Sequence, residues 1–133
     1  MRALFLGLGG VGQRHLRNLK KLRPQTKMAA VRHFPRVFEV NNNLKADNST
    51  NIEEKYAIET FPSIEESLKF KPDLAIVSNP SSLHIDTVTK LVENGIPTFV
   101  EKPLATQKTA LLQLGDLVEK KSVPVMVGYQ LRF

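Results

Sequence analysis

The 133-residue sequence predicts an α/β fold, namely a doubly wound, mostly parallel sheet with helices on both faces. Two observations lead to this prediction. Short apolar runs, typical of buried strands, alternate with longer segments in which apolar residues recur at helical spacing. A cluster of glycines also joins the first apolar run directly to the first helical segment. Strands that alternate with helices pair in parallel through right-handed crossovers.

Six short apolar runs are the expected strands. Their brevity and their glycine, proline or polar flanks favour strands over helices. The run that contains Leu74 and Val77 is the most uniformly apolar, whereas the run that ends at Phe61 is the weakest. The expected strands cover residues 2–6, 27–32, 57–61, 73–78, 98–101 and 123–128.

The helical segments carry start and stop signals. The first begins in the glycine cluster and ends before Pro24. Ser63 and Glu66 have the spacing of a capping box, which predicts a short helix that stops before Pro72. Two further helices are expected from Ser82 to Gly95 and over residues 106–121.

Residues 34–51 interrupt this alternation. They include the polar, turn-prone stretches 41–43 (NNN) and 47–51 (DNSTN). We therefore expect an exposed loop, with a short helix over residues 35–40 as its one regular element.

Composition narrows the class of protein. With 41% hydrophobic and 24% charged residues, the chain has the composition of a globular protein. The net charge is +6, but the basic residues are dispersed and do not alternate with aromatic residues, so no nucleic-acid partner is expected. The absence of cysteine excludes disulfides and a cysteine nucleophile, and no His/Asp/Glu grouping has the spacing of a metal site. No stretch approaches the length of an apolar membrane helix, so we expect no membrane segment and a cytoplasmic location.

The glycine cluster matches the pattern G-x-G-x-x-G. Gly7 would allow the tight turn, Gly9 the close approach of a pyrophosphate, and Gly12 the packing of helix against strand. The helix that follows would present unpaired amides and its positive dipole end to the phosphates. The same string also occurs in purely structural turns, but here a strand precedes it and a periodic helix follows. We therefore expect a Rossmann-type domain whose dinucleotide contacts include Gly7, Leu8, Gly9, Gly10, Val11 and Gly12.

The end of the second expected strand bears on the choice of cofactor. In NAD-binding domains this position usually carries an acid that holds the ribose hydroxyls. Here it carries Arg32, followed by His33 and Arg36, and the next acid is Glu39. An arginine suits a 2′-phosphate, which slightly favours NADP over NAD. The alternative is a solvated basic turn.

Four segments resemble the Gfo/Idh/MocA family of sugar and polyol dehydrogenases. They are residues 73–80 (DLAIVSNP) followed by His84, residues 100–105 (VEKPLA), residues 9–15 and residues 128–133. Their order and spacing fit the family, and the E-K-P element is fairly specific. Two departures are the Ser78-Asn79 pair, where threonine is common, and Arg32, where many members have an acid or a small residue.

The resemblance implies roles for individual residues. Lys102 follows a strand end, where ligands bind in such sheets, and it is expected to be catalytic by donating to the substrate oxygen. Taken alone, it would be a surface lysine. Glu101 would pair with Lys102 or orient it, His84 would hydrogen-bond a loop backbone, and His15 would pack against the glycine loop. Beyond the glycine cluster, the expected cofactor-binding residues are Arg32, Ser78, Asn79, Pro80, His84, Glu101 and Lys102.

The resemblance also implies a two-domain enzyme. Residues 1–133 would be its dinucleotide-binding domain, and a substrate domain with most substrate contacts and a catalytic histidine is expected C-terminal to residue 133, absent from this chain. The implied function is hydride transfer between a nicotinamide cofactor and a hydroxyl carbon of a sugar, nucleotide-sugar or polyol, in a homo-oligomer. The alternative is a non-catalytic dinucleotide-binding or redox-sensing module, which would not need Lys102.

Overall fold

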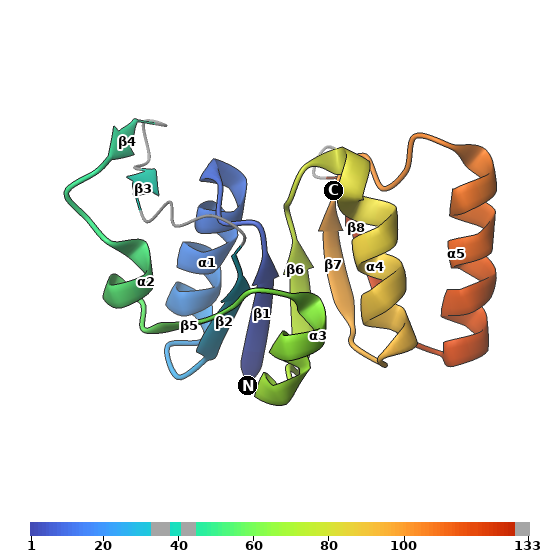
Figure 1. The fold of residues 1–133 in the computed structure, drawn as a ribbon, viewed down its shortest axis with the longest axis horizontal. Coiled ribbons are helices and arrows are strands. Elements are labelled where there is room, and N and C mark those ends of the chain that lie inside the picture. The colour runs from blue at the N-terminus through green and yellow to red at the C-terminus, as the bar shows by residue number, and fades with distance from the viewer. Residues whose placement is uncertain (33–37, 41–44, 130–133) are drawn as a thin grey trace.

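The computed structural model describes residues 1–32, 38–40 and 45–129. A six-stranded sheet forms the centre of this described part (Figure 1). Its strands are β1 (Arg2–Leu6), β2 (Lys27–Val31), β5 (Ile58–Phe61), β6 (Leu74–Val77), β7 (Thr98–Glu101) and β8 (Val125–Gly128). Their order is β5-β2-β1-β6-β7-β8, and every neighbouring pair is parallel. The predicted α/β fold is confirmed.

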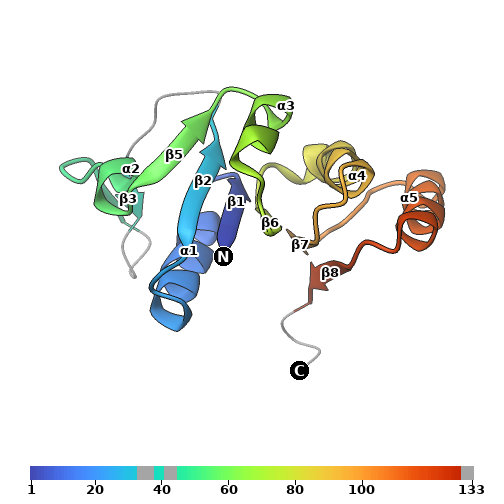
Figure 2. The same cartoon turned by 90° about the horizontal axis from the view of Figure 1, so that it is seen from below.

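Helices cover both faces of this sheet. α1 (Gly10–Leu22) lies on one side, whereas α3 (Ile64–Ser67), α4 (His84–Glu93) and α5 (Lys108–Lys121) lie on the other, as Figure 2 shows. The chain builds outward from β1 to β5 and then returns to place β6 on the other side of β1. The switch point of this doubly wound topology therefore lies between β1 and β6. Among the described residues, no helix is long and apolar enough to cross a membrane.

The central strands bury side chains on both faces. Leu4 and Leu6 belong to the core cluster that α4 covers, whereas Ala3 and Phe5 pack in the second cluster with Leu16 of α1. All five side chains are at most 3% exposed. Burial on both faces explains why β1 is an uninterrupted apolar run rather than an alternating one.

The helix signals of the sequence have the expected partners. The Ser63 hydroxyl accepts a hydrogen bond of 3.1 Å from the Glu66 amide and caps α3. Gly95 follows α4 with a φ of +73°, the left-handed conformation that commonly ends a helix. Both α4 and α5 begin two residues later than predicted, and a 3₁₀ turn at Ser81–Leu83 precedes α4.

The segment between β2 and β5 contains more regular structure than a loop. The expected helix over residues 35–40 is wrong where the structure describes it, because Glu39–Val40 forms strand β3, which pairs antiparallel with β4 (Ala46–Asp47). The remainder of that prediction falls on residues 33–37, which lie outside the described residues, as do residues 41–44.

A side chain of α1 explains the extended backbone of β3. The Gln13 amide nitrogen donates to the Phe38 carbonyl at 2.9 Å, and its Oε1 accepts from the Val40 amide at 2.6 Å. These bonds satisfy the two backbone groups that a strand leaves at its edge. The chain then forms α2 (Ile52–Lys55), a short helix that was not predicted, although Asn51 caps it through its side chain.

Candidate cofactor-binding and active site

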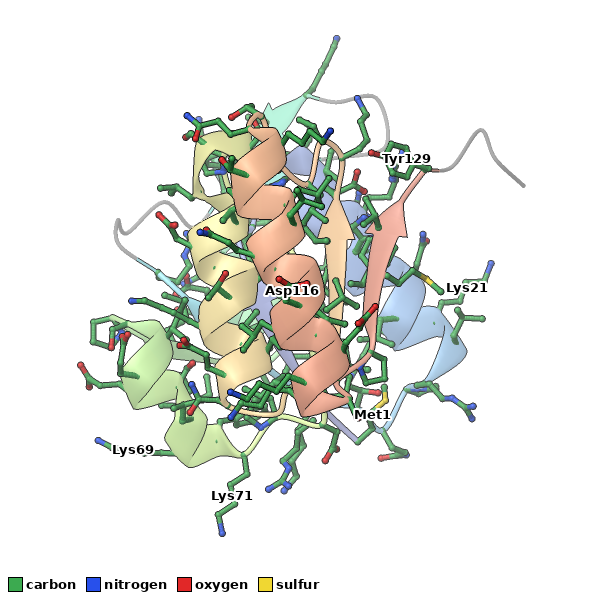
Figure 3. The ribbon with its side chains drawn as sticks, turned by 90° about the vertical axis from the view of Figure 1, so that its right-hand side faces the viewer. Met1, Lys21, Lys69, Lys71, Asp116 and Tyr129 are labelled. Atoms are coloured by element: carbon green, nitrogen blue, oxygen red, sulfur yellow. The ribbon has the colours of Figure 1, made fainter. Side chains whose placement is uncertain are left out.

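The predicted site residues meet at one edge of the sheet. Leu6 of β1 is paired with both Val31 of β2 and Val77 of β6, and β7 continues this register. The next row of residues, which we call the carboxyl edge, consists of Gly7, Arg32, Ser78 and Glu101. Figure 3 shows Tyr129, which follows β8, at this end of the sheet and Met1 at the opposite end. Ligands of doubly wound sheets bind at this edge, beside the switch point.

Two glycines of the loop are required by the protein's own packing. Gly7 has a φ of +103°, and a Cβ there would lie 2.6 Å from the backbone nitrogen of Asn79. A Cβ at Gly12 would lie 2.1 Å from the Gly7 carbonyl oxygen and 2.6 Å from the Ser78 hydroxyl oxygen. Gly7 therefore makes the tight turn and Gly12 allows the close packing of α1, as predicted.

Gly9 has different surroundings. Its φ is −73°, and a Cβ built there meets no atom within 4 Å. The protein's own packing therefore does not require a glycine at this position, and the space beside it is open. Gly9 is the N-cap of α1, no side chain caps this end, and the first turn holds no acidic residue. Its first amides have no intrahelical partners, so this open space suits a pyrophosphate.

The other loop residues have mixed roles. Leu8 is 5% exposed and packs in the core, whereas Val11 is 44% exposed. The Leu8 carbonyl accepts a hydrogen bond of 3.0 Å from Gln13, which is itself 1% exposed. Sequence reasoning missed Gln13, although its place three residues before Leu16 puts it on the buried face of α1.

The end of β6 is tied to the glycine loop. The Ser78 hydroxyl donates to the Gly7 carbonyl at 2.9 Å. Next to it, the Asn79 side-chain nitrogen donates to the Thr87 hydroxyl at 2.9 Å, and the Asn79 Oδ1 is buried with no partner among the described residues. Pro80 is exposed and begins the 3₁₀ turn. Asn79 thus holds an unused acceptor beside the loop, which fits a ligand that brings a hydroxyl or amide donor.

His84 joins two of the strand ends. Its side chain is 2% exposed, and its Nδ1 lies 2.8 Å from the Pro103 carbonyl oxygen. Its Nε2 lies 2.9 Å from the Asn79 carbonyl oxygen. The expectation that His84 hydrogen-bonds a loop backbone is confirmed. Both ring nitrogens contact protein carbonyls. His84 would therefore affect cofactor binding by positioning these two loops and not by direct contact.

Glu101 has a partner other than the expected one. His15 of α1 places its Nε2 2.7 Å from the Glu101 Oε1, and its ring meets Phe99 edge-on with 5.1 Å between the centroids. No ion pair between Glu101 and Lys102 is found among the described residues. The alternative that Glu101 orients Lys102 stays a prediction, as does the packing of His15 against the glycine loop. Lys102 is exposed just after β7, and the Lys102–Pro103 peptide bond is cis.

Arg32 lies at the end of β2, but it faces an acid that sequence reasoning did not identify. Its Nε lies 2.9 Å from the Oε1 of Glu53 in α2, and the two side chains are only 15% and 22% exposed. Asn51 positions this acid, because its side chain accepts from the amides of Glu53 and Glu54. The capping-box spacing of Asn51 and Glu54 was the available signal for this helix.

The pKa shifts of Asp73 and Lys55 belong to groups outside the predicted site residues. At the opposite end of the sheet, the Arg2 backbone amide donates to Asp73 at 2.7 Å and lowers the pKa of that carboxyl. On α2, a hydrogen bond of 2.6 Å to Glu39 raises the pKa of Lys55. Within the part of the chain that the structure describes, no three His, Asp or Glu side chains gather as metal ligands. The carboxyl edge therefore offers backbone amides, the Asn79 acceptor and the Lys102 ammonium.

Comparison with known proteins gives relatives that include two inositol dehydrogenases. The scyllo-inositol 2-dehydrogenase (NAD(+)) of Bacillus subtilis is 30% identical over 135 aligned positions, which cover 100% of this chain and 36% of that protein. A myo-inositol dehydrogenase of Streptomyces leeuwenhoekii is 43% identical over 61 residues, which are 46% of this chain and 19% of that protein. The aligned part of this chain therefore spans little more than a third of the first relative and just under a fifth of the second.

Solved structures show the same fold. Scyllo-inositol dehydrogenase from Lactobacillus casei, with bound NAD(H) and scyllo-inositol, has a TM-score of 0.81 and 18% sequence identity, over 100% of this chain and 37% of that one. A family model described as "Oxidoreductase family, NAD-binding Rossmann fold" matches residues 1–129. The chain belongs to this family, the Gfo/Idh/MocA oxidoreductases, as an NAD-binding Rossmann domain.

Proposed function

We propose that this chain is the cofactor-binding domain of a dehydrogenase that transfers a hydride between NAD(P) and a hydroxyl carbon of a polyol or sugar. The observation that carries the proposal is the carboxyl edge, where an open glycine loop and Lys102 follow strands on either side of the switch point. Relatives named as inositol dehydrogenases make a cyclic polyol the first substrate to try.

The residues of the loop fit a dinucleotide. The open space at Gly9 and the unpaired first amides of α1 would take the pyrophosphate. The unpartnered Oδ1 of Asn79 would accept from a cofactor hydroxyl or amide, with Ser78 and Pro80 beside it. When bound, the nicotinamide accepts or supplies the hydride.

Lys102 would hold the substrate oxygen. Its ammonium has three donors and no acceptor, and it is exposed at the carboxyl edge. Within the part of the chain that the structure describes, no ion pair joins this ammonium to Glu101, whose Oε1 contacts His15. When the carbon loses its hydride, the hydroxyl proton must also leave. The ammonium would donate to the oxygen and stabilise the charge that develops there, while the proton would pass to water or to a base of the expected second domain.

Two observations bear on the choice between NAD and NADP, and they favour different cofactors. The preference for NADP rests on Arg32 at the end of β2 and stays a prediction. The contact between Arg32 and Glu53 supports the opposite preference, since the positive charge already has an acidic partner.

The proposal extends to the whole protein. We expect most substrate contacts to come from a second domain outside residues 1–133, because the relatives that match this chain are much longer. A homo-oligomer in the cytoplasm, with a small-molecule substrate and neither nucleic acid nor a membrane as partner, is part of the same proposal.

The experiment is a substrate screen with the full-length protein. NAD(P)H absorbance is followed with inositols, other polyols and sugars, and cofactor binding is measured separately by calorimetry. We expect cofactor binding and oxidation of at least one cyclic polyol. Failure to bind either NAD or NADP would overturn the proposal. Cofactor binding without any reduction of NAD(P) in the presence of polyols or sugars would favour the non-catalytic module.

A further inference from the structure

An acidic side chain from helix α2 contacts the residue at the end of β2. Dinucleotide-binding domains commonly hold the adenosine ribose with a carboxylate at the end of this strand. In this sequence that position is Arg32, but the fold brings Glu53 of α2 to within 2.9 Å of the Arg32 side chain. The register places Arg32 beside Gly7, since Val31 is paired with Leu6. A carboxylate therefore contacts the side chain of the residue that neighbours Gly7 in the sheet.

We propose that Glu53 accepts the ribose hydroxyls of the cofactor and so selects NAD over NADP. This inference rests on the proposed function, because it needs a dinucleotide in the glycine loop. It assigns a specificity-determining role to a residue that follows the β3–β4 pair rather than to the residue at the end of β2.

The geometry leaves Glu53 able to take a ligand. One of its oxygens, Oε1, contacts Arg32, whereas a carboxylate has about four acceptor positions. The contact with Arg32 is an ion pair of 2.9 Å between its Nε and the Glu53 Oε1. The Glu53 side chain is 22% exposed, so part of it remains open to solvent and able to take a ligand.

Glu53 is also fixed in place. The Asn51 side chain accepts from the Glu53 amide at 3.0 Å and donates to Glu54 at 2.8 Å. Ile52, the first residue of α2, is fully buried in the core cluster beneath α1. An acid on a capped and anchored turn loses little conformational freedom when it binds a hydroxyl.

The same pair disfavours a 2′-phosphate. The phosphate group carries a charge of about −1.5 to −2 at neutral pH, and it would have to approach a half-buried carboxylate. Arg32 would ordinarily attract it, but Glu53 offsets that charge at 2.9 Å. Removal of the carboxylate should therefore weaken NAD binding and release Arg32 to NADP.

The test is a calorimetric titration of NAD and NADP into wild-type protein, Glu53→Gln and Glu59→Gln. Glutamine keeps the size of the side chain and removes its charge. Glu59 is the matched control, because it lies on the neighbouring strand β5, is exposed and does not help to position Glu53. We expect wild-type protein and Glu59→Gln to bind NAD more tightly. In Glu53→Gln the ratio of the two dissociation constants should shift towards NADP by about tenfold or more.

The double variant Glu53→Gln/Arg32→Ala separates this mechanism from a general loss of structure. If Arg32 is the group released, the gain in NADP affinity should disappear in the double variant. Weaker binding of both cofactors to Glu53→Gln would indicate damage to the fold and overturn the inference, as would an unchanged ratio or a wild-type preference for NADP. If wild-type protein bound neither cofactor, the proposed function would fall as well.

Discussion

Gly7, Gly9 and Gly12 of the glycine loop differ in backbone conformation and in the space beside them. Gly7 needs its positive φ, and Gly12 has no room for a Cβ because the Gly7 carbonyl oxygen is too close. Gly9 meets neither condition, since its φ is ordinary and the space beside it is open. Because Gly9 also lies at the start of α1 on the carboxyl edge, its open surroundings fit the close approach of a pyrophosphate.

This difference gives the first prediction, for Gly9→Val. The variant should still fold with only a small fall in Tm, because no atom lies within 4 Å of the new Cβ and the loss of glycine at this N-cap costs about 1 kcal/mol. It should bind NAD(H) at least about a hundredfold more weakly, since the side chain fills the space for the pyrophosphate. Gly115→Val on α5, where a Cβ is equally unobstructed, is the control. Calorimetry that finds wild-type affinity in Gly9→Val would show that the loop is only a turn.

Lys102 carries the second prediction. In the full-length protein, Lys102→Ala should lower kcat by about two to four orders of magnitude. Cofactor affinity should hardly change, because the glycine loop and not Lys102 would hold the phosphates. Lys108→Ala, at the exposed start of α5, controls for the loss of a positive charge nearby. A wild-type kcat in Lys102→Ala would make Lys102 a surface residue, and equal losses in both variants would point to a general charge effect.

Residue-level prediction succeeded where a local pattern carries the information. The turn at Gly7 and the cap at Ser63 depend on neighbours a few positions away, and both were predicted. The partner of Glu101 was not, because His15 lies 86 positions earlier and only the placement of α1 beside β7 brings the two together. The residue type limits the contacts that a side chain can make, and the tertiary fold determines which of those contacts form.

The same distinction holds for elements. The central strands β1, β2 and β6 were predicted because burial on both faces leaves continuous apolar runs in the sequence. The β3 and β4 strands have only two residues each, and α2 has four, too short for a periodic pattern. What holds β3 is the Gln13 side chain of α1, a long-range contact without a signature in the β3 sequence itself.

Gln13→Leu tests how much β3 depends on that contact. Leucine fits the buried face of α1, but it leaves the Val40 amide and the Leu8 carbonyl without their partner. We expect the free energy of unfolding in urea to fall by about 1–3 kcal/mol, the usual cost of buried polar groups left unpaired. Gln107→Leu is the control, because Gln107 is exposed and its side chain caps nothing. Equal stability of the two variants would mean that other contacts hold β3.

At the scale of the whole molecule, the doubly wound sheet turns separate strand ends into one site. β1 brings the glycine loop, β6 brings Asn79, and β7 brings Lys102, and the parallel register aligns all three at the carboxyl edge. The His84 ring links the last two, since it contacts carbonyls of both the β6 and the β7 loops. Because parallel pairing was predictable from the order of strands and helices, the gathering of these residues was predictable too. The Arg32–Glu53 pair was not, because it depends on α2.

The last prediction concerns what residues 1–133 can do alone. They should bind NAD(P), because the glycine loop, the start of α1 and the Asn79 acceptor all lie within them. They should nevertheless oxidise no polyol or sugar at a measurable rate, since Lys102 alone cannot orient a substrate. Orientation is a large share of the barrier reduction, with effective molarities that reach about 10⁵–10⁸ M in well-placed systems. Calorimetry and NADH absorbance on residues 1–133 and on the full-length protein measure both properties. Ordinary turnover by residues 1–133 would contradict the two-domain proposal, because the substrate would then need no contacts beyond the carboxyl edge.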